Sequence, residues 1–316
     1  MAELGLVLKE SWRRYRASPV LWQEALQLAF VGVLGILFLG SLFIGAGTGG
    51  VGLLLLGVGA YMAMALAGLG GVCAAVCGGR AATSKDFSGG RKRFFWRAAG
   101  FVGLVNLTSV VFGLIAGGLG VPGVGSSRLL SLNPATASAA AALGPQAQVW
   151  TQVYGAVSGL VIALLFCFGG AATALENIPT TRGISRGLDF VGRRFWLALG
   201  LLVLAALVVQ GPALILVVPV IANLPSLTGP GAAPAALTVA AWTVPLALAF
   251  AVYTCFAAPF ALLMMFVAYG RHRGLVQPLA PSPAAPPPAT PAAPSRPGAP
   301  TGTPPAGAGP SSPGAG

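Results

Sequence analysis

The sequence predicts an all-α integral membrane protein, and three observations carry that prediction. Of the 316 residues, 56% are hydrophobic and only 8% are charged, which is too few charges for a water-soluble surface. Six stretches lack Asp, Glu, Lys, Arg and His over the length that a helix needs to cross a membrane, about 20 residues. Seventeen of the 18 basic residues fall on one side of a membrane that the six stretches cross in turn.

The expected membrane domain covers residues 1–275 and contains six transmembrane helices. They span residues 25–47, 51–77, 98–120, 150–175, 195–222 and 237–269. The last stretch corresponds to about 50 Å of helix, which is too short for two spans and a turn. It therefore predicts one tilted or kinked helix, in which Pro245 and Pro259 favour a bend.

The positions of the bases predict the orientation, because Lys and Arg are retained on the cytoplasmic side of a membrane. Seventeen of the 18 bases precede the first span, follow the sixth, or lie between spans two and three or spans four and five. Arg128 is the exception. We therefore expect a multi-pass protein of the cytoplasmic (inner) membrane with both termini in the cytoplasm.

Two bases followed by an aromatic residue recur before spans one, three and five, at residues 13–15, 92–94 and 193–195. This recurrence predicts three hairpin repeats, each with a basic cytoplasmic elbow followed by two helices. The first and third elbows have the periodicity of amphipathic interfacial helices, and Thr180 or Thr181 is placed to cap the third. Gly89 and Gly90 are expected to break the second elbow.

The elbows are the first candidate binding sites, because bases beside tryptophan at a span boundary are typical of contact with anionic lipids. Two uses remain open: the elbows enforce topology and anchor the spans, or they bind specific lipids or a partner. The dispersal of the bases argues against nucleic acid despite a formal charge of +12. The candidate interface residues are Trp12, Arg13, Arg14, Lys92, Arg93, Trp96, Arg193, Arg194 and Trp196.

Polar residues inside the spans are few and mild. Asn106, Gln152 and Gln210 are candidates for an intramembrane polar path, and interhelical hydrogen bonding is their alternative use. Glu176 ends the fourth span, where an acid opposes the helix dipole. We therefore expect it to have a basic partner in a neighbouring elbow.

Catalytic chemistry has little to build on in this sequence. Six acids and one histidine in the whole chain leave no metal site, carboxylate pair or triad to expect, so neither an enzyme nor a cofactor is predicted. Residues 276–316 are rich in Pro, Ala and Gly and cannot bury a core. They predict a disordered cytoplasmic tail.

The basic and aromatic elbows at residues 8–22 and 184–199, each leading into a Gly- and Ala-rich hairpin, carry a family resemblance. They resemble uncharacterised bacterial six-span proteins similar to the membrane domain attached to some glycerophosphoryl diester phosphodiesterases. The resemblance covers roughly residues 1–275. In such families catalysis belongs to a separate soluble barrel rich in His and acids, so the resemblance implies no catalytic residue here.

The expected function is that of a non-enzymatic structural, lipid-associated or accessory subunit. Its expected partners are anionic membrane lipids and an unidentified membrane protein. The alternative is a small transporter or lipid-translocating permease built on the threefold hairpin repeat. A polar cavity lined by Asn106, Gln152 and Gln210 would favour transport, whereas a solid interior would favour the accessory role.

Overall fold

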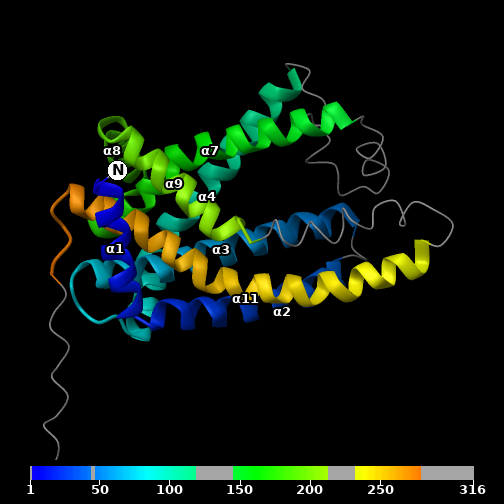
Figure 1. Cartoon of the computed structure of the whole chain (residues 1–316), viewed down its shortest axis with the longest axis horizontal. Helices are drawn as coiled ribbons and strands as arrows, with labels where there is room; N and C mark the ends of the chain where they lie inside the picture. Colours follow the sequence, from blue (N-terminus) through cyan, green and yellow to red (C-terminus); the bar gives the residue numbers. More distant parts are fainter. Residues whose placement is uncertain (1, 44–46, 119–144, 213–231, 279–316) are drawn as a thin grey trace, which may run out of the picture. The chain divides into compact units, whose positions relative to one another are not determined.

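The computed structural model describes residues 2–43, 47–118, 145–212 and 232–278, and the regular structure in these residues is α-helical throughout. In chain order the helices are α1 (Ala2–Arg16), α2 (Val20–Phe43), α3 (Gly47–Cys77), α4 (Ser84–Gly118), α7 (Pro145–Leu175), α8 (Thr180–Arg193), α9 (Phe195–Gln210) and α11 (Ala232–His272). The long helices run alongside one another, and the short helices α1 and α8 lie at one end of them (Figure 1).

Four helical segments are long and apolar enough to cross a membrane: Leu56–Cys77, Ser84–Gly118, Val153–Leu175 and Leu248–His272. Helices α8 and α9, which are bent by 105° relative to each other, make a fifth if the pair counts as one span. The chain is thus an all-helical protein with four to five candidate membrane spans among its described residues.

The described part of each predicted span falls mainly on one helix. The expectation of a single helix over residues 237–269 is confirmed, because α11 runs unbroken through Pro245 and Pro259. The ends of the first, third and fifth predicted spans, and the predicted tail from residue 279 onward, lie outside the described residues.

The first and third elbows form the separate helices α1 and α8, but the expected break in the second elbow is wrong. Helix α4 continues through Gly89 and Gly90. The reason is a close helix crossing: a Cβ on Gly90 would lie 2.7 Å from the Ala67 carbonyl oxygen and 2.8 Å from Gly71 Cα in α3. Gly90 therefore lets two backbones approach rather than ending a helix.

The crossing of α7 and α8 is built in the same way. A Cβ on Gly187 would lie 2.8 Å from Gly169 Cα and 2.9 Å from the Phe168 carbonyl carbon. The cap predicted for α8 is absent, since its N-cap is Pro179 without a side-chain cap. Thr180 instead donates its hydroxyl to the Arg97 carbonyl at 3.1 Å, which ties the start of α8 to α4.

Tyrosine hydroxyl groups link the two helices within each of three pairs: α2 with α3, α4 with α7, and α9 with α11. In every pair the later helix donates to a backbone carbonyl of the earlier one. The bonds join Tyr61 to Leu28, Tyr154 to Phe112 at 2.5 Å, and Tyr253 to Val208 at 2.5 Å. Such interhelical bonds contribute about 0.6 kcal/mol each on average in a bilayer.

The tightest packing lies at the end of the helices that carries α1 and α8. Buried residues of α11 cluster between Ala257 and Tyr269, and they pack with Val72 and Val76 of α3 and with Phe168 of α7. Farther along the helices many large apolar side chains are exposed, Leu56 and Leu114 among them. The described residues are therefore packed densely at one end of the helices and less densely farther along.

Candidate functional site

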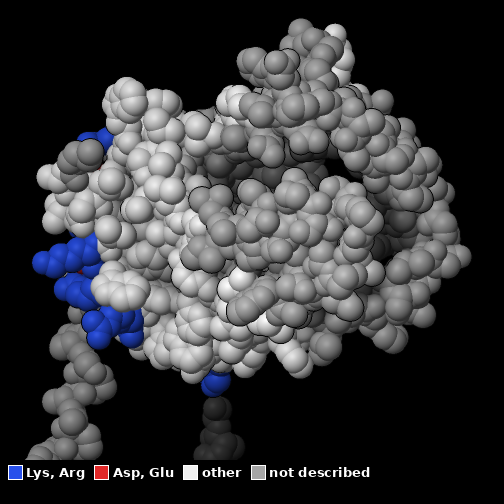
Figure 2. Space-filling view, turned by 45° about the vertical axis from the view of Figure 1, so that its right-hand side comes forward, with Lys and Arg blue, Asp and Glu red and all other residues white. Residues whose placement is uncertain are grey.

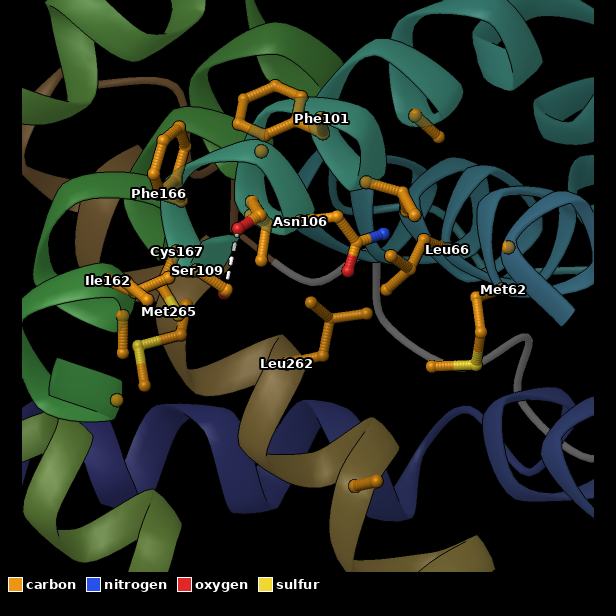
Figure 3. Close-up of a pocket in the computed structure, with 18 of the residues that line it drawn as sticks. Met62, Leu66, Phe101, Asn106, Ser109, Ile162, Phe166, Cys167, Leu262 and Met265 are labelled. Atoms are coloured by element: carbon orange, nitrogen blue, oxygen red, sulfur yellow. Dashed lines mark hydrogen bonds between the residues drawn. The ribbon is translucent and has the colours of Figure 1, made fainter. Parts of the chain in front are cut away.

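A cavity of about 1870 Å³ lies between α3, α4, α7, α9 and α11 (Figure 3). Its wall on α4 extends from Phe94 to Leu114, which is about 30 Å of helix. That length matches the ~30 Å hydrocarbon core of a bilayer. We call this cavity the hollow; it follows the helices over a membrane-spanning distance.

Most side chains that line the hollow are apolar, including Met62, Leu66, Leu262 and Met265. Two of its polar side chains bond within their own helices: Ser109 donates to the Val105 carbonyl at 2.8 Å and Ser158 to the Gly155 carbonyl at 3.2 Å. These hydroxyl groups are satisfied locally. The hollow thus offers an apolar surface with few polar groups free to bind a ligand.

Asn106 is the main polar exception. Figure 3 shows its amide between Leu66 and Leu262, with no hydrogen bond to the other residues drawn. Gln210 also lines the hollow, so the structure brings together two of the three residues predicted for a polar path. The third, Gln152, lies in α7, and its side chain is outside what the structure describes.

Neither of the two expected interiors is found among the described residues. A cavity that is open to the surroundings at Leu56 and Leu114 lies between the described helices, which a purely structural role did not require, and its wall is mainly apolar, which a polar path did not predict. An apolar, elongated hollow suits a hydrocarbon chain better than an ion or a polar solute.

Arg93 and Arg97 lie at one end of the hollow, which Arg97 and Phe94 help to line. The two guanidinium groups donate to the same atom, Oδ1 of Asn177, at 3.1 and 2.8 Å. Both also lie over the Phe94 ring, 5.3 and 5.8 Å from its centroid. Asn177 has a φ of 54°, a left-handed conformation that Asn tolerates better than most residues. We call Arg93, Phe94, Arg97 and Asn177 the rim.

Arg97 and Asn177 were not among the predicted site residues. The spacing of Arg93 and Arg97 was a usable signal, because residues four apart share one face of a helix. The part played by Asn177 has no such signal, since it depends on the end of α7 lying beside the turns of α4 that carry Arg93 and Arg97.

Several bases in and directly after α1 and α8 pair with acids. Arg13 and Arg14 pair with Glu10, Arg193 with Asp189 at 2.9 Å, and Arg194 with Glu3 at 3.0 Å. Burial favours a higher pKa for Glu10, but the hydrogen bonds and charges of Arg14 and Arg13 outweigh it and lower the pKa below its ordinary value. Glu10 therefore stays ionised as the centre of this cluster.

Arg14 differs from the other elbow bases because its side chain is only 1% exposed. It donates to the Val76 carbonyl at 2.5 Å, to the Gln277 carbonyl at 2.6 Å and to Glu10 at 2.7 Å. It thereby joins α1, the end of α3 and the segment after α11. This geometry places Arg14 inside the protein rather than at the headgroups.

The predicted interface residues do not form one site. Trp96 and Trp196 are 82% and 80% exposed, whereas Trp12 packs against Tyr15 and Phe260. Lys92 lies in a separate small pocket beside Arg91 and Trp96. Figure 2 shows Lys and Arg gathered towards one end of the described surface, next to broad uncharged faces.

The basic partner expected for Glu176 is confirmed. Its carboxylate lies 4.0 Å from Arg186 of α8 and 3.5 Å from Arg273, and it accepts a hydrogen bond from Tyr269. The acid that directly precedes Asn177 is therefore turned to other partners and not to the rim.

No protein-family model, curated protein or solved structure matches this chain. The resemblance to six-span proteins with the phosphodiesterase membrane domain therefore stays a prediction. The hollow and the rim are therefore the features from which a function can be inferred.

Proposed function

We propose that this is a non-enzymatic membrane protein that holds lipid chains in the hollow and acts as a lipid-associated or accessory subunit. The observation that carries the proposal is the apolar lining of a cavity of about 1870 Å³ along α4 from Phe94 to Leu114. This volume exceeds the roughly 300–1,000 Å³ of ordinary ligand pockets, so a long hydrocarbon chain is a fitting occupant.

The proposal includes six spans in three hairpins, with both termini on the cytoplasmic side of the cytoplasmic membrane. Three features support it: the bases gather towards one end (Figure 2), a tyrosine links each helix pair in the same direction, and α1 and α8 lie at one end (Figure 1). The exposed bases Arg13, Lys92, Arg193 and Arg194 would then meet anionic headgroups. Arg14 has no part in this contact because it is buried.

Cysteine labelling tests the topology. In a background in which the four native cysteines are replaced by alanine, Ser127→Cys and Ser226→Cys should react with an impermeant maleimide in intact cells. Ser185→Cys in α8 should react only after the cells are opened. Labelling of Ser185→Cys in intact cells would show that the orientation is wrong.

Filling the hollow tests the lipid proposal. A Cβ on Gly155 or Gly159 of α7 meets nothing within 4 Å, and both residues line the hollow. The double variant Gly155→Phe, Gly159→Phe should therefore fold while blocking the hollow with two rings one turn apart. We expect the variant to lose most of the lipid that co-purifies with the parent, measured by native mass spectrometry after mild detergent extraction.

A matched pair on α4 supplies the control. Gly113 and Gly103 both have open space around a Cβ, but only Gly113 lines the hollow. Gly113→Phe should lower lipid retention and Gly103→Phe should not. Equal retention in the parent, in the α7 double variant and in Gly113→Phe would refute the lipid proposal.

A lipid-translocating permease remains the second candidate, because the hollow is as long as the hydrocarbon core and has the Asn106 amide along its course. Reconstituted vesicles with a fluorescent lipid in one leaflet distinguish the two functions. Transfer between leaflets that the Gly155→Phe, Gly159→Phe variant abolishes would favour the permease. Retention of lipid without transfer favours the accessory role.

A further inference from the structure

The rim concentrates positive charge on a neutral acceptor. Arg93 Nε and Arg97 Nη1 both donate to Asn177 Oδ1, at 3.1 and 2.8 Å. Two groups that share one acceptor atom lie close to each other, and their like charges repel, although both bonds lie at the exposed surface, where water weakens the repulsion. An amide oxygen offers only a partial negative charge against two full positive charges. The two guanidinium groups therefore lack a full negative charge as a partner at Asn177.

No carboxylate of the described residues completes it. Glu176 is turned to Arg186 and Arg273, and Asp86 to Arg80. The remaining described ion pairs use Glu3, Glu10 and Asp189 with bases outside the rim. The charge of Arg93 and Arg97 is thus available to an anion from outside the chain.

The surroundings of the rim indicate which anion fits. The Phe94 ring lies beneath both guanidinium groups and lines the hollow together with Arg97. A ligand bound here has its charged group against two planar donors and its remainder beside an apolar cavity. Guanidinium groups bind phosphoryl oxygens through paired, charge-assisted hydrogen bonds.

We propose that Arg93 and Arg97 bind the phosphoryl group of a phospholipid whose acyl chains lie in the hollow. The inference rests on the proposed function and names the class of lipid. Asn177 acts as a positioning residue, because it holds both guanidinium groups at the mouth of the hollow. The Thr180 hydroxyl, through the Arg97 carbonyl, fixes the start of α8 beside the same turn of α4.

The test compares two lipids that differ in the phosphoryl group. Delipidated protein in detergent is titrated with dioleoyl phosphatidylglycerol or with dioleoylglycerol, and binding is followed by native mass spectrometry. For Arg93→Gln, Arg97→Gln we expect the Kd of phosphatidylglycerol to rise about 30-fold, at roughly 1 kcal/mol per base. The Kd of dioleoylglycerol should stay unchanged.

The control variant Lys9→Gln, Arg16→Gln removes the same charge from two exposed bases of α1, and no described ion pair uses either base. It should leave both dissociation constants within about twofold, since neither base lines the hollow. An equal loss of phosphatidylglycerol binding in the control would overturn the proposal in favour of a general charge effect. An unchanged Kd in the rim variant would overturn it outright.

Two further measurements, phosphate binding and lipid binding by the hollow-filling variant Gly155→Phe, Gly159→Phe, distinguish a bound phospholipid from free phosphate and from a lipid held by the hollow alone. The proposal expects inorganic phosphate at millimolar concentration to bind the parent and to compete with phosphatidylglycerol. It also expects the hollow-filling variant to bind phosphate but neither lipid. These results together would show that the rim binds phosphoryl groups. If phosphate binds and neither lipid binds the parent, the ligand is free phosphate and the lipid assignment fails. If the hollow-filling variant loses both lipids and the rim variant loses neither, the proposed function stands and the phosphoryl assignment fails.

Discussion

Replacing Arg14 with Gln is expected to lower the free energy of unfolding by about 3 kcal/mol, in the range measured for breaking buried ion pairs. The side chain is 1% exposed and makes charge-assisted hydrogen bonds to Glu10, Val76 and Gln277. Gln is too short to reach all three partners, and the two carbonyl groups would lose their shared donor. Equilibrium unfolding in mixed micelles measures the change.

Arg13 supplies the matched control, because it pairs with the same carboxylate of Glu10 but its side chain is 61% exposed. Arg13→Gln should change the free energy of unfolding by less than about 1 kcal/mol, as exposed ion pairs do. The contrast isolates burial, since both variants remove one positive charge from α1. Similar effects of the two variants would show that Arg14 does not join α1 to α3 and to the segment after α11.

The case of Arg14 shows where sequence reasoning reached its limit. The amphipathic periodicity of the first and third elbows correctly predicted short helices there, α1 and α8, because periodicity is a local property of the sequence. The pattern of two bases before an aromatic residue placed Arg14 among the headgroup bases. Its burial depends on Gln277, far away in the chain, and no local pattern reports such a contact.

The hollow was beyond prediction for a similar reason. Composition and charge-free length identified the helices, because the membrane imposes them on every span. Whether helices meet in a solid core or around a cavity depends on how side chains of five helices interlock. Asn106 and Gln210, predicted for a polar path, both line this cavity, but its wall is mainly apolar and so indicates a different class of ligand.

Glycine was the residue type most easily misread. The sequence predicts a helix break at Gly89 and Gly90, since a glycine inside a helix costs about 1 kcal/mol relative to alanine. In the structure Gly90 packs against Gly71 of α3, whereas a Cβ on Gly89 meets nothing within 4 Å. Tertiary contact therefore explains one of the two glycines.

These two neighbouring glycines give the last prediction. Gly90→Ala should lower the free energy of unfolding by about 1–3 kcal/mol, the usual cost of overpacking, because its methyl group would lie 2.7 Å from the Ala67 carbonyl oxygen and 2.8 Å from Gly71 Cα. Both neighbours are backbone atoms, so only a separation of α3 from α4 can relieve the clash. Equilibrium unfolding in mixed micelles checks the value.

Gly89→Ala adds the same methyl group one residue earlier, in open space, and should raise the free energy of unfolding by up to about 1 kcal/mol through helix propensity. The two variants are therefore expected to shift stability in opposite directions. A stabilising Gly90→Ala would mean that α3 and α4 do not cross at Gly71. Arg93 and Phe94 follow Gly90 by about one turn of α4 and Arg97 by about two turns. Loosening this crossing should therefore also weaken phosphatidylglycerol binding in Gly90→Ala and leave it intact in Gly89→Ala.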